Sequence, residues 1–318
     1  MSHSNFLPVR ISTLKSGVSL GFDLYIELPH KKLMYVRGNY DIETERISSL
    51  KDKKVRKLFI QEMDEDKYQS FLDRCLSSIS DDSSIGTDEK ADLLIGAGEA
   101  TAERIYSNPE TLRSYKAAAN TSSHLRRVLN QNSELLKSIF DRGLSRSDRD
   151  FDSLMHLHSV NTATLCIGFA EYMGFQPEQV EILGLAGLYH DVAYGKCDYK
   201  ELFFKPLAEL DPEERKRYFQ HPFEGKEYLA DKEFVNPSLL DLIYSHEEKN
   251  QGNGFPRKLE KLTLEQEVLG IAAYYDRCLT CFQMAREEVF ENFSMNELGN
   301  YNLETIKKFK AFIKKSGL

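Results

Sequence analysis

The sequence predicts an all-α helical bundle in the C-terminal half, preceded by a small α+β domain. After Asp150, apolar residues recur at helical spacing, and residues that favour helix ends separate the periodic stretches. Residues 8–75 instead form short alternating stretches separated by turn residues, which is typical of strands. A chain of 318 residues is long enough for two domains that each bury a core.

The N-terminal elements are predicted from four alternating stretches and one periodic stretch. Strands are expected at "VRISTL", "FDLYIEL", "KLMYVR" and "VRKLFIQ", and a helix is expected at "DIETERISSLKDK". The polar stretch "SSISDDSSIGTDEK" at 77–90 then breaks the pattern. We therefore predict an accessory or regulatory domain at 1–80, a helical linker at 81–147, interrupted near Asn108-Pro109, and a helical domain at 148–318.

The helices of the C-terminal half are predicted from the residues at their ends. A proline at the first helical position or a capping pair marks four starts: Pro177, Asp211-Pro212, Asn236-Pro237, and Thr263 with Gln266. Gly317 follows the last periodic stretch, as glycine often does after a helix. The sequence shows no internal repeat.

Charge and composition exclude several classes of protein. Residues 1–150 hold 23 acidic and 23 basic side chains, whereas residues 151–318 hold 27 acidic and 19 basic ones. The whole net charge of −8 therefore lies in the second half, which argues against a broad basic surface for nucleic acid. Five scattered cysteines, no long apolar run and no signal-peptide pattern predict a cytoplasmic protein without membrane insertion.

Potential metal ligands recur along the second half at a regular interval. Five of the eight histidines lie between positions 156 and 246. The candidate ligands lie on or at the ends of apolar helices, about one helical hairpin apart: His158, His190 with Asp191, His221, His246 and Asp276. Successive helices of a bundle can bring such side chains to one centre. His156 is expected to be structural, and the Cys278/Cys281 pair is expected to serve packing.

Five stretches in their order resemble the HD-GYP branch of the HD-domain metallophosphohydrolases, which are bacterial cyclic di-GMP phosphodiesterases. They are "HS" at 158, "HDVAYGK" at 190–196, "KPLAELDPEERKRYFQHPFEG" at 205–225, "SHEEKNQGNGFP" at 245–256 and "IAAYYDRCLT" at 271–280. The resemblance covers about residues 150–318. It implies an all-α HD-domain bundle around a metal centre that serves second-messenger signalling.

The resemblance also implies the roles of individual residues in two-metal hydrolysis. Asp191 would be catalytic and bridge two ions, with His158, His190 and Asp276 on one ion and His221 and His246 on the other. Leu154 occupies the place of a third-metal carboxylate, so two ions are expected, iron or manganese. Lys196 would contact the phosphate during catalysis. The substrate, cyclic di-GMP or a related cyclic dinucleotide, would also meet Gly254, Phe255, Pro256 and Arg257, and signalling proteins are possible partners.

The motifs depart from the family pattern at three places. The family's "HHE" reads Ser245-His246-Glu247, "GYP" reads Gly254-Phe255-Pro256, and "HDIGK" is two residues longer. We therefore expect weak hydrolysis of cyclic di-GMP. Two alternatives stay open: a cyclic di-GMP receptor or docking module that keeps the dinuclear centre without turnover, and an HD phosphohydrolase acting on nucleotides or other phosphodiesters.

Overall fold

The computed structural model describes residues 6–82, 84–132, 134–144 and 150–318. The chain divides into two compact units, Met1–Ala100 and Thr101–Leu318. The division falls within helix α3 (Thr87–Ser107). The predicted domain boundary between residues 147 and 148 lies outside the described residues.

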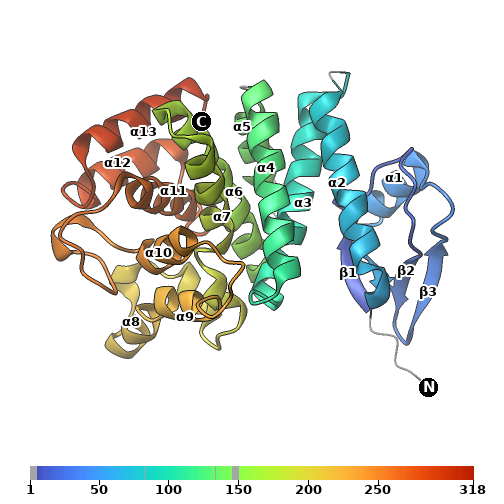
Figure 1. The fold of residues 1–318 in the computed structure, drawn as a ribbon, viewed down its shortest axis with the longest axis horizontal. Coiled ribbons are helices and arrows are strands. Elements are labelled where there is room, and N and C mark those ends of the chain that lie inside the picture. The colour runs from blue at the N-terminus through green and yellow to red at the C-terminus, as the bar shows by residue number, and fades with distance from the viewer. Residues whose placement is uncertain (1–5, 83, 133, 145–149) are drawn as a thin grey trace. The chain divides into compact units, whose positions relative to one another are not determined.

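The first unit contains a four-stranded antiparallel sheet, the helices α1 and α2 (Figure 1, blue) and the N-terminal part of α3. The sheet order is β1 (Phe6–Arg10), β4 (Lys57–Gln61), β2 (Leu24–Leu28), β3 (Lys31–Val36). Helix α1 (Thr44–Asp52) precedes β4, and α2 (Glu65–Asp81) follows it. The predicted α+β character is confirmed, although β1 begins earlier than expected and Ile11–Thr13 forms a 3-10 turn.

The stretch predicted as a linker contributes helices to both units. The N-terminal part of α3 belongs to the first unit, where the buried Glu99 accepts a hydrogen bond of 2.9 Å from Arg10. Helix α4 (Leu112–Gln131) packs against α6 and α7, and α5 (Leu135–Leu144) packs against α6. Because α4 buries apolar residues such as Leu125 and Val128 there, it is part of the second compact unit.

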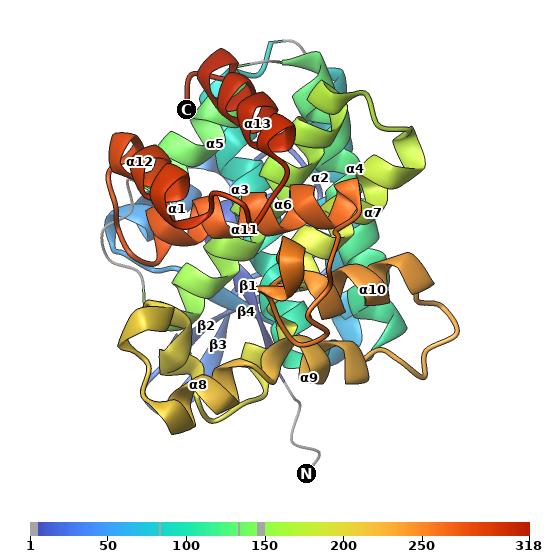
Figure 2. The same cartoon turned by 90° about the vertical axis from the view of Figure 1, so that its left-hand side faces the viewer.

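The core of the second unit is built from α6 (Phe151–Met173), α7 (Pro177–Tyr189) and α11 (Leu264–Thr280). Figure 2 shows α11 lying across α6 and α7, both of which it contacts. Gly187 permits the close approach of α6 and α7, since a Cβ atom there would lie 2.5 Å from the backbone nitrogen of Ala163. This contact places the end of α7 beside the middle of α6.

Shorter helices complete the unit: α8 (Pro212–Tyr218), α9 (His221–Glu227), α10 (Pro237–Ser245), α12 (Arg286–Asn296) and α13 (Leu303–Lys315). The predicted caps are confirmed. Asp211 accepts from two backbone N–H groups of α8 at 2.9 and 2.8 Å, and Asn236 accepts from Ser238 at 2.8 Å. None of the helices in the described ranges has the length and apolar character that crossing a membrane requires.

Candidate metal centre

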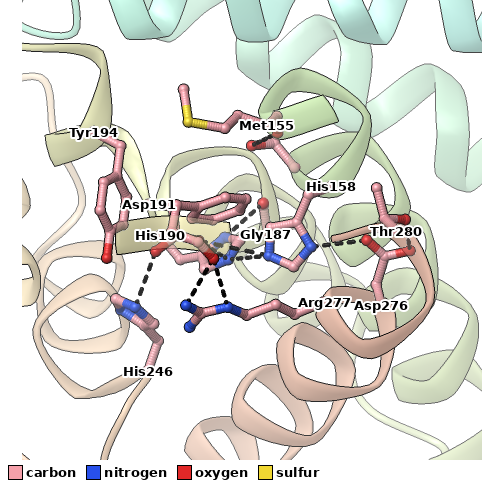
Figure 3. A network of polar contacts seen from close by, with 12 residues as sticks. Met155, His158, Gly187, His190, Asp191, Tyr194, His246, Asp276, Arg277 and Thr280 are labelled. Carbon is pink, nitrogen blue, oxygen red and sulfur yellow. Dashed lines mark hydrogen bonds and ion pairs between the residues drawn. The ribbon is translucent and has the colours of Figure 1, made fainter. Parts of the chain in front are cut away.

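Five of the six predicted ligands converge in the interior of the helical unit. His158 lies in α6, and His190 and Asp191 directly follow α7. His221 is the first residue of α9, and His246 directly follows α10. Each of the five is at most 4% exposed. Four rigid elements therefore bring polar side chains to one buried place (Figure 3).

Asp191 lies between two pairs of histidines and contacts each pair through a different oxygen. Its Oδ2 atom lies 3.1 Å from Nε2 of His190 and 3.5 Å from Nε2 of His158. Its Oδ1 atom lies 3.3 Å from Nε2 of both His221 and His246. The side chains thus form two groups of potential metal ligands that share Asp191.

The pair His221 and His246 directs two ring nitrogens at one place where a cation could bind. The two Nδ1 atoms lie 2.6 and 2.7 Å from the carbonyl oxygens of Tyr218 and Ile243, which only accept hydrogen bonds. Each neutral ring therefore carries its proton on Nδ1 and a lone pair on Nε2. The two Nε2 atoms are 2.9 Å apart. Both lone pairs can be donated to one metal ion, which would relieve their mutual repulsion.

The pair His158 and His190 repeats this arrangement. Nδ1 of His190 lies 3.0 Å from the carbonyl oxygen of Gly187, and Nδ1 of His158 lies 2.7 Å from Oδ2 of Asp276. The two Nε2 atoms are 3.1 Å apart. Four imidazole nitrogens around a shared carboxylate form a donor set that suits transition-metal ions. The residues present therefore fit a dinuclear centre.

Burial and the charges within the cluster shift the pKa values of its own side chains. Burial alone would raise the pKa of Asp191, but the charge of His190 and hydrogen bonds from the histidines hold this pKa well below its usual value. Burial alone would lower the pKa of His158, but Asp191 and Asp276 raise it to about 8. The pKa of His190 is lowered, chiefly by burial. Asp191 is therefore ionised at neutral pH, as a bridging ligand must be.

Asp276 lies outside both groups, although the resemblance places it on one ion with His158 and His190. Its Oδ2 atom faces Nδ1 of His158, on the side of the ring away from the cluster (Figure 3). Its Oδ1 atom accepts hydrogen bonds from Asn161 at 2.8 Å and from Thr280 at 3.0 Å. Both carboxylate oxygens are thus occupied by protein partners.

Lys196 is held by a partner at the surface. Its Nζ atom lies 3.8 Å from Oε2 of Glu110, and its side chain is 35% exposed. The two additional residues of "HDVAYGK" lie in a 3-10 turn, Val192–Gly195, which separates Asp191 from Lys196. In the described part of the chain, this lysine forms an ion pair with Glu110 and not with the histidine cluster, so its expected phosphate contact stays a prediction.

The predicted substrate-binding residues lie in a tightly packed loop after α10. A Cβ atom at Gly254 would lie 2.2 Å from the backbone nitrogen of Lys249, so this position accepts only glycine. The Phe255 ring is 9% exposed and stacks on Phe219 at 4.2 Å between centroids, and the Phe255-Pro256 peptide bond is cis.

The last predicted substrate residue, Arg257, is engaged by the protein. Its guanidinium group donates to Asp241 at 2.9 Å and to the hydroxyl of Ser245 at 2.6 Å. Its backbone nitrogen and those of Lys258 and Leu259 donate to the buried carboxylate of Glu248. These hydrogen bonds hold the loop against the protein, and substrate contact by Arg257 stays a prediction.

A partly buried ionic network that the sequence motifs did not reveal lies next to the cluster. The Arg277 guanidinium donates to the Phe203 carbonyl oxygen at 2.8 Å and to the hydroxyl of Tyr218, which in turn donates to Glu247. Figure 3 shows the Arg277 side chain among the labelled residues of the cluster. The sequence could have indicated this network, because Arg277 and Glu247 directly follow the predicted ligands Asp276 and His246.

Comparison with known proteins agrees with this site. Residues 156–278, which contain all five clustered residues and Asp276, match the family model of the HD domain. The cyclic di-GMP phosphodiesterase PA4108 of Pseudomonas aeruginosa is 28% identical over 127 residues. That match covers 39% of this chain and only 30% of the relative's own length. The second unit therefore contains an HD domain.

The likeness extends to the whole fold in one solved structure. Bd1817, described as "a HDG"Y"P protein from Bdellovibrio bacteriovorus", matches with a TM-score of 0.76 and 25% sequence identity. The match covers 98% of this chain and 100% of that one, so both units are included. The chain thus contains an HD domain and is similar over nearly its whole length to a protein described as HD-GYP.

Proposed function

We propose that the protein is a metal-dependent phosphodiesterase that hydrolyses cyclic di-GMP slowly. The observation that carries the proposal is the pair of ligand groups joined by Asp191, in which the Nε2 atoms of two histidines face each other in each group. Asp191 would bridge two ions, with His158 and His190 on one and His221 and His246 on the other. When bound, two such ions supply a water activated for attack on phosphorus and positive charge toward the phosphoryl oxygens.

The charge of the site supports an anionic substrate. Three carboxylates, those of Asp191, Asp276 and Glu247, lie in or directly behind the cluster, together with one guanidinium, that of Arg277. Two divalent ions would convert this excess of negative charge into a local positive charge. A phosphodiester would then be attracted to the site although the chain as a whole carries −8.

The more specific part of the proposal is that the substrate is a cyclic dinucleotide. Its support is the name of the curated relative, a cyclic di-GMP phosphodiesterase, together with the order of the HD-GYP-like motifs. The expectation of slow turnover comes from Ser245 and Phe255. Neither provides the imidazole or phenolic hydroxyl of the family pattern, and loss of one placed donor costs about 10²–10³ in rate.

A receptor that has lost turnover is the second candidate. The structure favours it at one place, because the Ser245 hydroxyl accepts from Arg257 at 2.6 Å and Gln266 at 3.2 Å. The position that carries a second imidazole in the family is therefore part of an internal hydrogen-bond network of the protein. Such a site would keep the ions and bind the dinucleotide without cleaving it.

One experiment distinguishes these functions. The metal content of the purified protein is measured by elemental analysis, and the same sample is incubated with cyclic di-GMP, cyclic GMP-AMP and bis(4-nitrophenyl) phosphate. Slow cleavage of cyclic di-GMP by a protein with about two ions per chain supports the proposal. Binding of cyclic di-GMP without cleavage supports the receptor. Preference for the aryl diester, or a folded protein that takes up no metal, contradicts both.

A further inference from the structure

The four histidines of the cluster are not oriented in the same way. His190, His221 and His246 each direct Nδ1 to a neutral backbone carbonyl three residues earlier in the chain. His158 instead directs Nδ1 to the carboxylate of Asp276, which comes from α11. A carboxylate behind a ligating imidazole fixes the ring and increases its strength as a donor to metal. The two ligand groups are therefore unequal.

Two donors hold Asp276 in this role. Nδ2 of Asn161 lies 2.8 Å and Oγ1 of Thr280 lies 3.0 Å from Oδ1 of Asp276. Asn161 lies one helical turn after His158, and Thr280 lies one turn after Asp276, so each faces the same side of its helix as the residue that it supports. Asp276 and Asn161 are 0% exposed and Thr280 is 3% exposed, so these contacts replace water for the carboxylate.

The orientation of Asn161 distinguishes this network from ordinary packing between α6 and α11. Its Nδ2 atom serves the carboxylate, whereas its own Oδ1 atom is buried and has no hydrogen-bond partner within the described ranges. A buried acceptor without a partner costs free energy. The amide group thus provides the contact to Asp276 and leaves its own acceptor unsatisfied.

We infer that Asn161 and Thr280 are positioning residues that make the two metal positions unequal. They hold Asp276 against Nδ1 of His158, which keeps the Nε2 lone pair of that ring directed at the ion. The position formed by His158, His190 and Asp191 then binds its ion more tightly than the position on the other side of Asp191. This inference rests on the proposed dinuclear centre.

The test uses Co²⁺ uptake by the metal-free full-length chain. Thr280→Val removes one donor without changing the shape of the side chain, and Asn161→Leu removes the other. Thr164→Val is the matched control, because Thr164 is also 0% exposed and its hydroxyl donates to the Val160 carbonyl within α6. Co²⁺ bound per chain is counted by elemental analysis after equilibration with graded chelator, and the visible spectrum of Co²⁺ reports ligand geometry.

Parent protein is expected to bind about two Co²⁺ ions with different affinities. Thr280→Val should weaken the tighter position about 10-fold and Asn161→Leu up to about 100-fold, the range measured for residues behind metal ligands. The weaker position and the Thr164→Val control should not change. His221→Gln, which impairs the weaker position, should leave one ion, and adding Thr280→Val should weaken that ion by the same factor.

The outcomes separate the inference from the proposed function. A parent protein that takes up no Co²⁺ contradicts both. A parent protein that binds two ions, with both positions weakened equally by Thr280→Val or neither weakened relative to Thr164→Val, overturns only the inference. If Asn161→Leu fails to fold, Thr280→Val decides the question alone, because it removes one of two donors and keeps the buried volume.

Discussion

Replacing Asp191 by asparagine should weaken both metal positions at once, because each uses a different oxygen of this carboxylate. Oδ1 lies 3.3 Å from Nε2 of His221 and of His246, and Oδ2 lies 3.1 Å from Nε2 of His190. Asp191→Asn keeps the shape of the side chain and removes its charge. A ligand that served one ion would affect one position only.

The expected magnitude follows from charge and burial. Two unit charges 4 Å apart interact by about 4 kcal/mol at an effective dielectric constant of about 20, and a divalent ion doubles this value. Asp191 is 4% exposed, so screening by water is small. Desolvation of the ion offsets much of the attraction. We expect a loss of about 3 kcal/mol for each ion, which weakens each position about 100-fold.

The assay is metal content after dialysis at fixed free metal concentration, with circular dichroism as a check of the fold. Asp211→Asn is the matched control, since Asp211 caps α8 away from the cluster and asparagine caps a helix equally well. The helical spectrum should persist in both variants. Full metal occupancy in Asp191→Asn, or loss of one ion with the other retained at parental affinity, would refute the bridging role.

Three further predictions concern the periphery of the site. Lys196→Ala should lower turnover about 100-fold, because the charge expected at the phosphate is lost; steady-state turnover within about threefold of the parent would contradict the phosphate contact and leave the ion pair with Glu110. Metal uptake should weaken up to about tenfold for each pH unit below about 8, where a proton occupies His158 in the metal-free protein, and should level off at higher pH. A Mn²⁺ affinity independent of pH would contradict that pKa. Ser245→His with Phe255→Tyr should raise turnover above that of the parent only when Arg257 is also replaced by alanine, and an equal gain without the third change would show that the arginine does not block the imidazole.

Much of the fold follows from local patterns in the sequence. The helices of the second unit begin where a capping residue precedes an apolar period, as Thr263 does before α11 with a side-chain contact of 3.3 Å to the backbone nitrogen of Gln266. The N-terminal strands alternate as half-buried strands do. The helices within the stretch predicted as a linker could not be assigned to a unit from the sequence. The polar stretch at 77–90 marks a turn between helices, but it does not reveal which partner buries the helices that follow.

The candidate site was predictable only as far as motif order determines it. His158, His190, His221 and His246 meet at Asp191 because each lies on or beside a helix that delivers it to the interior of the unit. Asp276 lies behind its histidine, since its direction depends on the rotation of α11 about its own axis. No spacing in the sequence specifies that rotation, which is fixed by the packing of α11 against α6 and α7.

Ser245, which replaces the family's second imidazole, belongs to a partly buried hydrogen-bond network. Ser245 donates to the carbonyl of Asp241, and Arg257 and Gln266 both donate to the Ser245 hydroxyl. The same Arg257 and Gln266 side chains also bind the Asp241 carboxylate at 2.9 Å each. Replacing Ser245 by histidine would remove the hydroxyl that accepts a hydrogen bond from Arg257. The larger imidazole would also compete with the guanidinium for space. Ser245, Arg257 and Gln266 of α11 thus share one hydrogen-bond network, and we expect that a histidine at 245 alone would disrupt it.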